Sequence, residues 1–559
     1  MAYLKSKTLF FTTSPRTPWK MIPEIKVLSE YFEGKVWNTK TQVEFIKKLA
    51  ESGEFQGEGS SKEMAFSGRD RINRAPKALG FVDLKPVIHL TDAGKKFLSG
   101  KKTEEILLRQ LLKFQLPSPY HREPEAFKGS FCVKPYLEIF RLIYELEEIR
   151  FDELMIFGMQ LIQYKDFEKI VAKIRQFRRE KLYKQTSYKI FRGEYLRKEV
   201  EELYQNDMKR GNIHTRESHD KTMDKFMKTK ANNMRDYADA CFRYLRATGM
   251  VELSQKGHSL SIAPEKKREV AFFLEHIDRE PTFVDNEEEY KKYLFSTTVP
   301  VLYTDDRERL LEQIVDLTGK RKEWKDQTTE QLKDELEVLT KKKKEIMIAQ
   351  QINALKSYQE YDNVMATFAD IQANRLYDTP LMLEWNTWRA MTMLDGGDIK
   401  ANLRLDDKGM PMSTAQGNVA DIVCDYGDFG LTVEVTMQSG QRQYEMEGEP
   451  VSRHLAKLKR ESGKEAYCLF LAPKINESCI AYFYALHQVN IAFYGGKSVI
   501  VPLELEVFIH MLEQSYQADY IPNTAQIKGI FQYSLEQAEQ ARDEKEWYSK
   551  VTEKALHWL

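Results

Sequence analysis

The sequence has little cysteine and no long apolar run. Its 559 residues include five cysteines and no CxxC pair, which excludes a disulfide framework and a cysteine-based zinc site. No stretch of about 18 apolar residues occurs, and the N-terminal residues lack the apolar core of a signal peptide. No GxSxG motif suggests acyl transfer. We therefore expect a cytoplasmic protein that is neither secreted nor inserted into a membrane.

The sequence also has no net charge of either sign, because 85 Lys and Arg residues balance 85 Asp and Glu residues. The distribution is uneven. Residues 171–250 hold 20 basic and 11 acidic side chains, whereas residues 401–450 hold 3 basic and 9 acidic ones. A basic stretch suits a phosphate partner and an acidic one suits metal cations, although ordinary solvated helices can show the same bias. Charge alone therefore does not decide the function.

One pattern occurs twice in the N-terminal half: a helix, a glycine that stops it, and two short strands. The first copy is expected at 67–79, Gly80, 81–84 and 87–91. The second copy is expected at 233–248, Gly249, 250–254 and 259–263. This order is typical of a winged helix, which places one helix in the major groove of DNA. Winged helices also bind proteins, but two copies with basic residues on or just before the helix favour DNA binding.

The C-terminal part reads differently. A helix at 381–394 precedes a Gly/Asp-rich loop, and two strands at 420–426 and 431–437 form a hairpin. A helix from Pro450 to about Glu461 and apolar strands at 466–472 and 498–503 complete an α/β pattern with a mixed sheet. The fold class we predict is multidomain, with a mostly α-helical N-terminal half that carries two winged-helix (α+β) modules, then a helical linker and a C-terminal α/β domain. The predicted domains are 1–120, 121–290, 291–365 and 366–559.

The predicted hairpin brings two acids together. If Gly427 and Asp428 form a two-residue turn, Asp421 lies directly opposite Glu434. Opposed residues have Cβ atoms about 4.5–5.5 Å apart, so the two carboxylates would repel each other unless a cation lay between them. Oxygen ligands suit Mg²⁺, whose bound water can attack a phosphodiester. A register shift of one residue would instead leave two separate acids on an exposed hairpin.

The run from Glu434 to His454, EVTMQSGQRQYEMEGEPVSRH, resembles the AlwI-like family of type IIS restriction and site-specific nicking endonucleases. The likeness extends to SPRTPWKMIPEIKVL, FSGRDR, MRDYADACFRYLRATG, EWNTW and YCLFLAPKIN, so it spans nearly the whole chain. The resemblance implies a nuclease domain of the PD-(D/E)xK superfamily at 366–559, with Asp421 as its first acid.

The same resemblance implies an active site of five residues: Glu384, Asp421, Glu434, Glu447 and His454. Metal ligands are expected at Asp421, Glu434 and Glu447, for Mg²⁺ with Mn²⁺ as a substitute. Thr436 stands where the wider superfamily has lysine. Glu447 or His454 is then the group expected to position the attacking water.

We expect the protein to bind double-stranded DNA and to cut it at a fixed short distance from an asymmetric site, such as GAGTC or GGATC in the family. Arg and Asn contact bases in the major groove, and the candidate readers are Arg69, Arg71, Arg74, Asn232, Asn233 and Arg235. One chain holds one catalytic site, so cutting both strands needs a second nuclease domain, from self-association or from a small partner subunit. A nicking enzyme that cuts one strand is the alternative, and a non-catalytic winged-helix regulator is a remote one.

Overall fold

The computed structural model describes residues 2–53, 60–215, 219–254, 257–320, 324, 326–394, 397–415, 417–518 and 523–559. The chain divides into an N-terminal unit, Met1–Ser254 with His258–Lys341, and a C-terminal unit, Gln255–Gly257 with Lys342–Leu559. The C-terminal unit thus begins earlier than the boundary at 366 expected from the sequence, since helix α16 (Tyr361–Gln372) packs on helix α17 (Thr379–Leu394). Among the described residues we find no helix with the length and apolar character needed to cross a bilayer.

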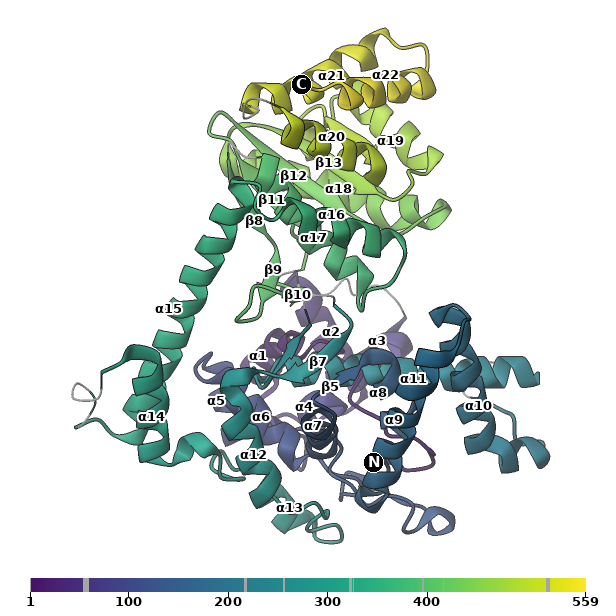
Figure 1. The fold of residues 1–559 in the computed structure, drawn as a ribbon, viewed down its shortest axis with the longest axis vertical. Coiled ribbons are helices and arrows are strands. Elements are labelled where there is room, and N and C mark those ends of the chain that lie inside the picture. Colours follow the sequence, from purple (N-terminus) through teal and green to yellow (C-terminus); the bar gives the residue numbers. More distant parts are fainter. Residues whose placement is uncertain are drawn as a thin grey trace. The chain divides into compact units, whose positions relative to one another are not determined.

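The N-terminal unit is mostly helical, as predicted (Figure 1). Its longer helices are α1 (Met21–Phe32), α2 (Thr39–Glu51), α3 (Ser61–Asn73), α6 (Thr103–Lys113), α7 (Pro135–Leu146), α9 (Phe167–Tyr183), α10 (Tyr188–Lys209), α11 (Met223–Arg246), α12 (Lys267–His276), α13 (Glu287–Phe295) and α14 (Arg307–Thr318). The shorter ones are α4 (Ala75–Ala78), α5 (Asp92–Leu98) and α8 (Phe151–Ile156). Helix α15 (Thr329–Lys356) contains the boundary between the two units.

Both expected hairpins are present in the N-terminal unit. After α3 and α4, strand β2 (Val82–Asp83) pairs antiparallel with β3 (His89–Leu90). After α11, strand β6 (Val251–Leu253) pairs with β7 (Ser259–Ile262), which also pairs with β5 (Glu148–Arg150). The remaining strands of this unit are β1 (Ala2–Tyr3) and β4 (His121–Arg122), which run parallel.

The helices before these hairpins differ from the prediction in their bounds. The single helix expected at 67–79 is two helices, α3 and α4, because Pro76 has no N–H to donate to the carbonyl of Ile72 and its ring would clash with that carbonyl in a continuous helix. Helix α3 begins at Ser61, where Ser60 and Glu63 form a capping box that the sequence reading overlooked. Helix α11 begins ten residues before the expected Asn233, capped by the side chain of Thr222.

The C-terminal unit contains a five-stranded sheet in the order β14-β13-β12-β11-β8. The strands are β8 (Asp398–Ala401), β11 (Ile422–Asp425), β12 (Phe429–Val435), β13 (Glu465–Ala472) and β14 (Ile500–Glu504). Neighbours β12, β13 and β14 run parallel, whereas β11 is antiparallel to both β12 and β8, which confirms the predicted mixed sheet. The central strands β12 and β13 are almost entirely buried, so the core of this unit surrounds them.

Helices pack on this sheet (Figure 1). Helix α17 contacts β8 and β12, and helix α18 (Gln441–Ser462) contacts β12 and β13. Strand β14 is contacted by the last four helices, α19 (Glu477–Gln488), α20 (Leu505–Gln517), α21 (Thr524–Gln540) and α22 (Glu544–Leu556).

Two expectations for this unit were wrong. The Gly/Asp-rich loop contains strand β8 and the paired strands β9 (Leu403–Leu405) and β10 (Pro411–Thr414). Strand β8 lies at the sheet edge and is four residues long with one buried residue, Ile399, so its alternation is too short to be recognised in the sequence. Helix α18 begins at Gln441 and Pro450 lies inside it. The early start is fixed by Gln443, whose buried amide donates to two backbone carbonyls and accepts from the backbone N–H of Asn476.

Candidate active site

The hairpin of β11 and β12 has the predicted register. Ile422 lies opposite Val433, and continuing the pairing by one residue places Asp421 opposite Glu434. The backbone N–H of Val435 donates to Asp421 Oδ2 at 2.9 Å. This hydrogen bond fixes the Asp421 carboxylate beside the end of β12, next to the buried side chain of Glu434.

Four carboxylates from three segments of the chain act on one another: Glu384 on α17, Asp421 and Glu434 on the hairpin, and Glu447 on α18. Burial is the largest cause that raises the pKa of each above its usual value, and for three of them a neighbouring carboxylate is the next cause. A buried set of like charges is costly unless a proton or a cation neutralises part of it. We call these four residues the acidic cluster.

Helix α18 places two side chains at the acidic cluster. Glu447 and His454 are seven residues apart, about two helical turns, and therefore lie on the same face. His454 Nδ1 lies 2.8 Å from Glu434 Oε1, and burial lowers the pKa of His454 to about 4. The hydroxyl of Thr436 forms a hydrogen bond with Glu447, which opposes the effect of burial on the pKa of that carboxyl. Thr436 therefore contacts a member of the cluster.

Two polar atoms at the cluster are buried and have no hydrogen-bond partner within the described part of the chain: Glu384 Oε2 and His454 Nε2. Buried polar atoms in folded proteins are nearly always hydrogen-bonded, so such atoms call for an explanation. Carboxylate oxygens that repel one another, together with unsatisfied polar atoms, fit a hard divalent cation and its bound waters. Among the residues that the structure describes, however, no three His, Cys, Asp or Glu side chains are gathered into a group that could hold a metal ion.

Asp378 is one residue at the cluster that the sequence reading missed. Its charge contributes to the raised pKa of Glu384, and it precedes α17 with a positive φ of 52°. In the sequence, the order Asp378-Thr379-Pro380 is typical of a helix start. That signal identifies a cap and not a site, so only the fold shows its proximity to Glu384.

The basic candidates for DNA binding on α3 have different surroundings. Arg71 pairs with the buried Glu24, and burial raises the pKa of Glu24 to about 7 in spite of that pairing. Arg74 pairs with Asp70 and donates to the Thr13 hydroxyl at 2.7 Å. Arg69 is exposed and lies over the Phe66 ring, 5.4 Å from its centre. Of the three, Arg69 is the side chain most available to an external partner.

The candidates on α11 lie near its middle. Asn232 and Arg235 are exposed and Asn233 is half-buried, whereas Met234 points into the core. For Arg235 the described residues offer no ion pair. The exposed face of α11 therefore presents an amide and a guanidinium to solvent.

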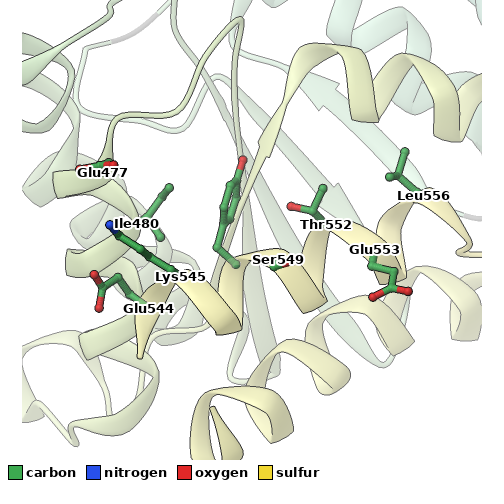
Figure 2. Close-up of a pocket in the computed structure, with 9 residues that line it drawn as sticks. Glu477, Ile480, Glu544, Lys545, Ser549, Thr552, Glu553 and Leu556 are labelled. Atoms are coloured by element: carbon green, nitrogen blue, oxygen red, sulfur yellow. The ribbon is translucent and has the colours of Figure 1, made fainter. Parts of the chain in front are cut away.

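A surface cavity of about 610 Å³ lies elsewhere in the C-terminal unit, between α19 and α22 (Figure 2). It is lined by Glu477 and Ile480 from α19 and by residues of α22 that include Lys545 and Tyr548. No member of the acidic cluster lines it, so this cavity is separate from the site described above.

Comparisons with known proteins identify the family. The sequence model of the AlwI restriction endonuclease matches residues 77–511. No curated protein matches the chain. Among solved structures, the small subunit (R.BspD6I2) of the heterodimeric restriction endonuclease R.BspD6I is 26% identical with a TM-score of 0.30, over 34% of this chain and 98% of that chain. Because the family match covers well over half of its length, the chain belongs to the AlwI family of restriction endonucleases, which cleave DNA.

Proposed function

We propose that the protein is a cytoplasmic, magnesium-dependent type IIS restriction endonuclease that binds a short asymmetric DNA site and cuts at a fixed distance outside it. The observation that carries the proposal is the acidic cluster. Burial raises the pKa of four carboxyls at the end of a hairpin, and for Glu384, Asp421 and Glu434 a neighbouring carboxylate raises it further. They lie beside a histidine with an unsatisfied buried nitrogen. Such a concentration of negative charge suits a divalent cation and phosphate chemistry.

Asp421, Glu434 and Glu447 are the residues that would hold the ion. Bound Mg²⁺ supplies an acidified water and offsets charge on the scissile phosphate. The chain's own part is to keep these oxygens in place. Asp421 is held by the N–H of Val435, and Glu447 by the hydroxyl of Thr436.

His454 is the group we propose to handle the proton of the attacking water. When Glu434 is ionised, its carboxylate accepts the hydrogen bond from Nδ1–H of His454. The neutral imidazole then presents Nε2 as a proton acceptor, and this is the buried atom without a partner. Glu384 Oε2 offers a second acceptor at the same site. Together they would orient a water where a lysine does so in the wider superfamily.

We propose that each helix–hairpin unit of the N-terminal half is a winged helix that reads DNA through α3 and α11. Arg69 and Arg235 are exposed and would contact phosphates or guanines, and Asn232 and Asn233 would contact adenine. Arg71 and Arg74 would contribute mainly by holding α3 through Glu24 and Asp70.

Cleavage of one strand is the second candidate function, because the described part of the chain holds one acidic cluster. Cutting both strands would need a second nuclease domain, from a second copy of this chain or from a small partner subunit. The experiment is digestion of supercoiled plasmid by the purified protein with Mg²⁺. Open circles indicate a nicking enzyme and linear molecules a double-strand break, and sequencing the product ends gives the site and the offset. Absence of cleavage of diverse DNA with both Mg²⁺ and Mn²⁺ would overturn the proposed function.

A further inference from the structure

The end of helix α9 and the start of helix α10 expose apolar side chains. Leu182 and Tyr183, at the end of α9, are 80% and 84% exposed, and Ile190, in the first turn of α10, is 55% exposed. Burying such a side chain is worth about 1.5–3 kcal/mol. A group of apolar side chains kept in water is therefore typical of an interaction surface. We call residues 179–192 the α9–α10 tip.

Contacts on both sides hold this tip in place. Phe177 and Phe191 stack with ring centres 5.0 Å apart. The Tyr188 hydroxyl donates to Asp152 Oδ2 at 3.0 Å, and Arg192 donates to Asp152 Oδ1 at 3.2 Å. The exposed side chains are thus carried by an ordered support.

The charge of the tip suits a polyanion. Residues 179–192 contain five basic side chains and one acidic side chain. Lys184 pairs with Glu194, whereas Arg179 and Lys189 are exposed and, among the described residues, have no ion-pair partner. These two exposed side chains place positive charge on either side of the exposed apolar group.

The tip belongs to the same packed body as α11. Tyr204 of α10 packs edge-on against Phe226 of α11, with ring centres 5.6 Å apart. Phe151 of α8, which follows strand β5, packs against Phe242 of α11 with ring centres 5.4 Å apart. DNA held by α11 would therefore meet the tip at a fixed place.

We propose that the α9–α10 tip is a further DNA contact, in which Arg179 and Lys189 bind phosphates and Leu182 and Tyr183 enter a groove of the duplex as an apolar wedge. Duplex DNA is the partner that offers both features, since cations bind its phosphates and apolar side chains can enter between its base steps. The inference rests on the proposed function, because it presupposes that the N-terminal unit binds DNA.

The test uses the full-length protein in EDTA, with a labelled duplex that contains the cleavage site and a second duplex without it. Each phosphate contact contributes about 0.9 to the slope of log affinity against log salt concentration. Arg179→Gln combined with Lys189→Gln should therefore make that slope about 1.8 less steep on both duplexes. The matched control, Lys128→Gln with Lys267→Gln, removes two exposed lysines of the same unit and should leave the slope unchanged.

The wedge is tested separately. Leu182→Ser with Tyr183→Ser removes apolar surface that the wedge would bury, and should therefore lower affinity by roughly fivefold or more. It should also reduce the bend that energy transfer between the duplex ends reports. Val338→Ser, which changes another apolar side chain that is 59% exposed, is its control. Unchanged slope and bend in the tip variants, with wild-type DNA binding intact, would overturn this inference alone. A changed sedimentation mass in place of changed DNA binding would identify a protein-binding surface and would also overturn it. Failure of the wild-type protein to bind either duplex would instead overturn the proposed function.

Discussion

Removing one charge from the acidic cluster should stabilise the metal-free protein. Asp421→Asn keeps an oxygen that can accept the hydrogen bond from Val435, but it ends the repulsion with Glu434. Two charges about 5 Å apart at an effective dielectric constant of about 20 repel by roughly 3 kcal/mol. Part of this repulsion is already relieved in the wild-type protein, because the raised pKa of Glu434 lets it take up a proton. We therefore expect the free energy of unfolding in EDTA to rise by about 1–3 kcal/mol.

Urea unfolding of the full-length protein, followed in EDTA and in excess Mg²⁺, measures this effect. A ligand at about 100 times its dissociation constant stabilises the folded state by about 2.7 kcal/mol. Wild type should gain stability of this order from Mg²⁺, whereas Asp421→Asn should gain little or none. Asp425→Asn is the matched control, since Asp425 lies on the same hairpin but is exposed and paired with Lys464. Its free energy of unfolding should fall by at most about 1 kcal/mol, and Mg²⁺ should stabilise it as much as wild type.

The reasoning would be refuted by two results together. The first is that Asp421→Asn destabilises the protein in EDTA, as an ordinary loss of a buried contact would. The second is that Mg²⁺ leaves the unfolding of wild type unchanged. The cluster would then be a neutral, protonated group with a structural role.

Three further changes have expected outcomes. Burial lowers the pKa of His487 from its ordinary value of 6.5 to about 4. In this range His487 is protonated in the unfolded chain but not in the folded protein. The free energy of unfolding therefore falls by about 3 kcal/mol as the pH drops from 6.5 to 4. His487→Gln should flatten that part of the stability–pH curve measured by urea unfolding. Arg71→Ala leaves Glu24 buried without its partner, so the free energy of unfolding should fall by up to about 3–5 kcal/mol, and by less at a pH where Glu24 is protonated. The slope of DNA affinity against salt concentration should stay unchanged. Thr436→Val removes the hydroxyl that holds Glu447 and should slow cleavage about 10–100-fold at unchanged DNA affinity. Thr436→Ser keeps a hydroxyl and should cleave DNA at close to the wild-type rate.

The hairpin was predictable because its signals are local. Gly427 and Asp428 form a two-residue turn, and strand pairing advances by one residue at a time, so the position of Asp421 opposite Glu434 followed from counting. Gly427 has a positive φ of 90°, which glycine adopts without strain. The apolar strand β13 was also evident, since a buried parallel strand reads as a continuous apolar run.

Apart from the local capping box of Ser60 and Glu63, the main features that were missed depend on contacts distant in sequence. Pro450 is a good first residue of a helix, but the buried amide of Gln443 anchors α18 nine residues earlier. The prediction of a single basic helix before the first hairpin treated its three arginines as equally good DNA-binding candidates. Only the fold shows that Arg71 is engaged by Glu24, 47 positions away. The contribution of Asp378 to the acidic cluster was hidden for the same reason.

The central claim is that the acidic cluster cleaves DNA bound by the rest of the chain. The most direct measurement compares Asp421→Ala and Glu434→Ala with wild type in two assays on the same preparations: gel shift on a duplex that contains the site, and cleavage of plasmid in Mg²⁺. Both variants should bind the duplex as wild type does and show no detectable cleavage, while Asp425→Asn cuts normally. Near-normal cutting by either alanine variant would contradict the claim.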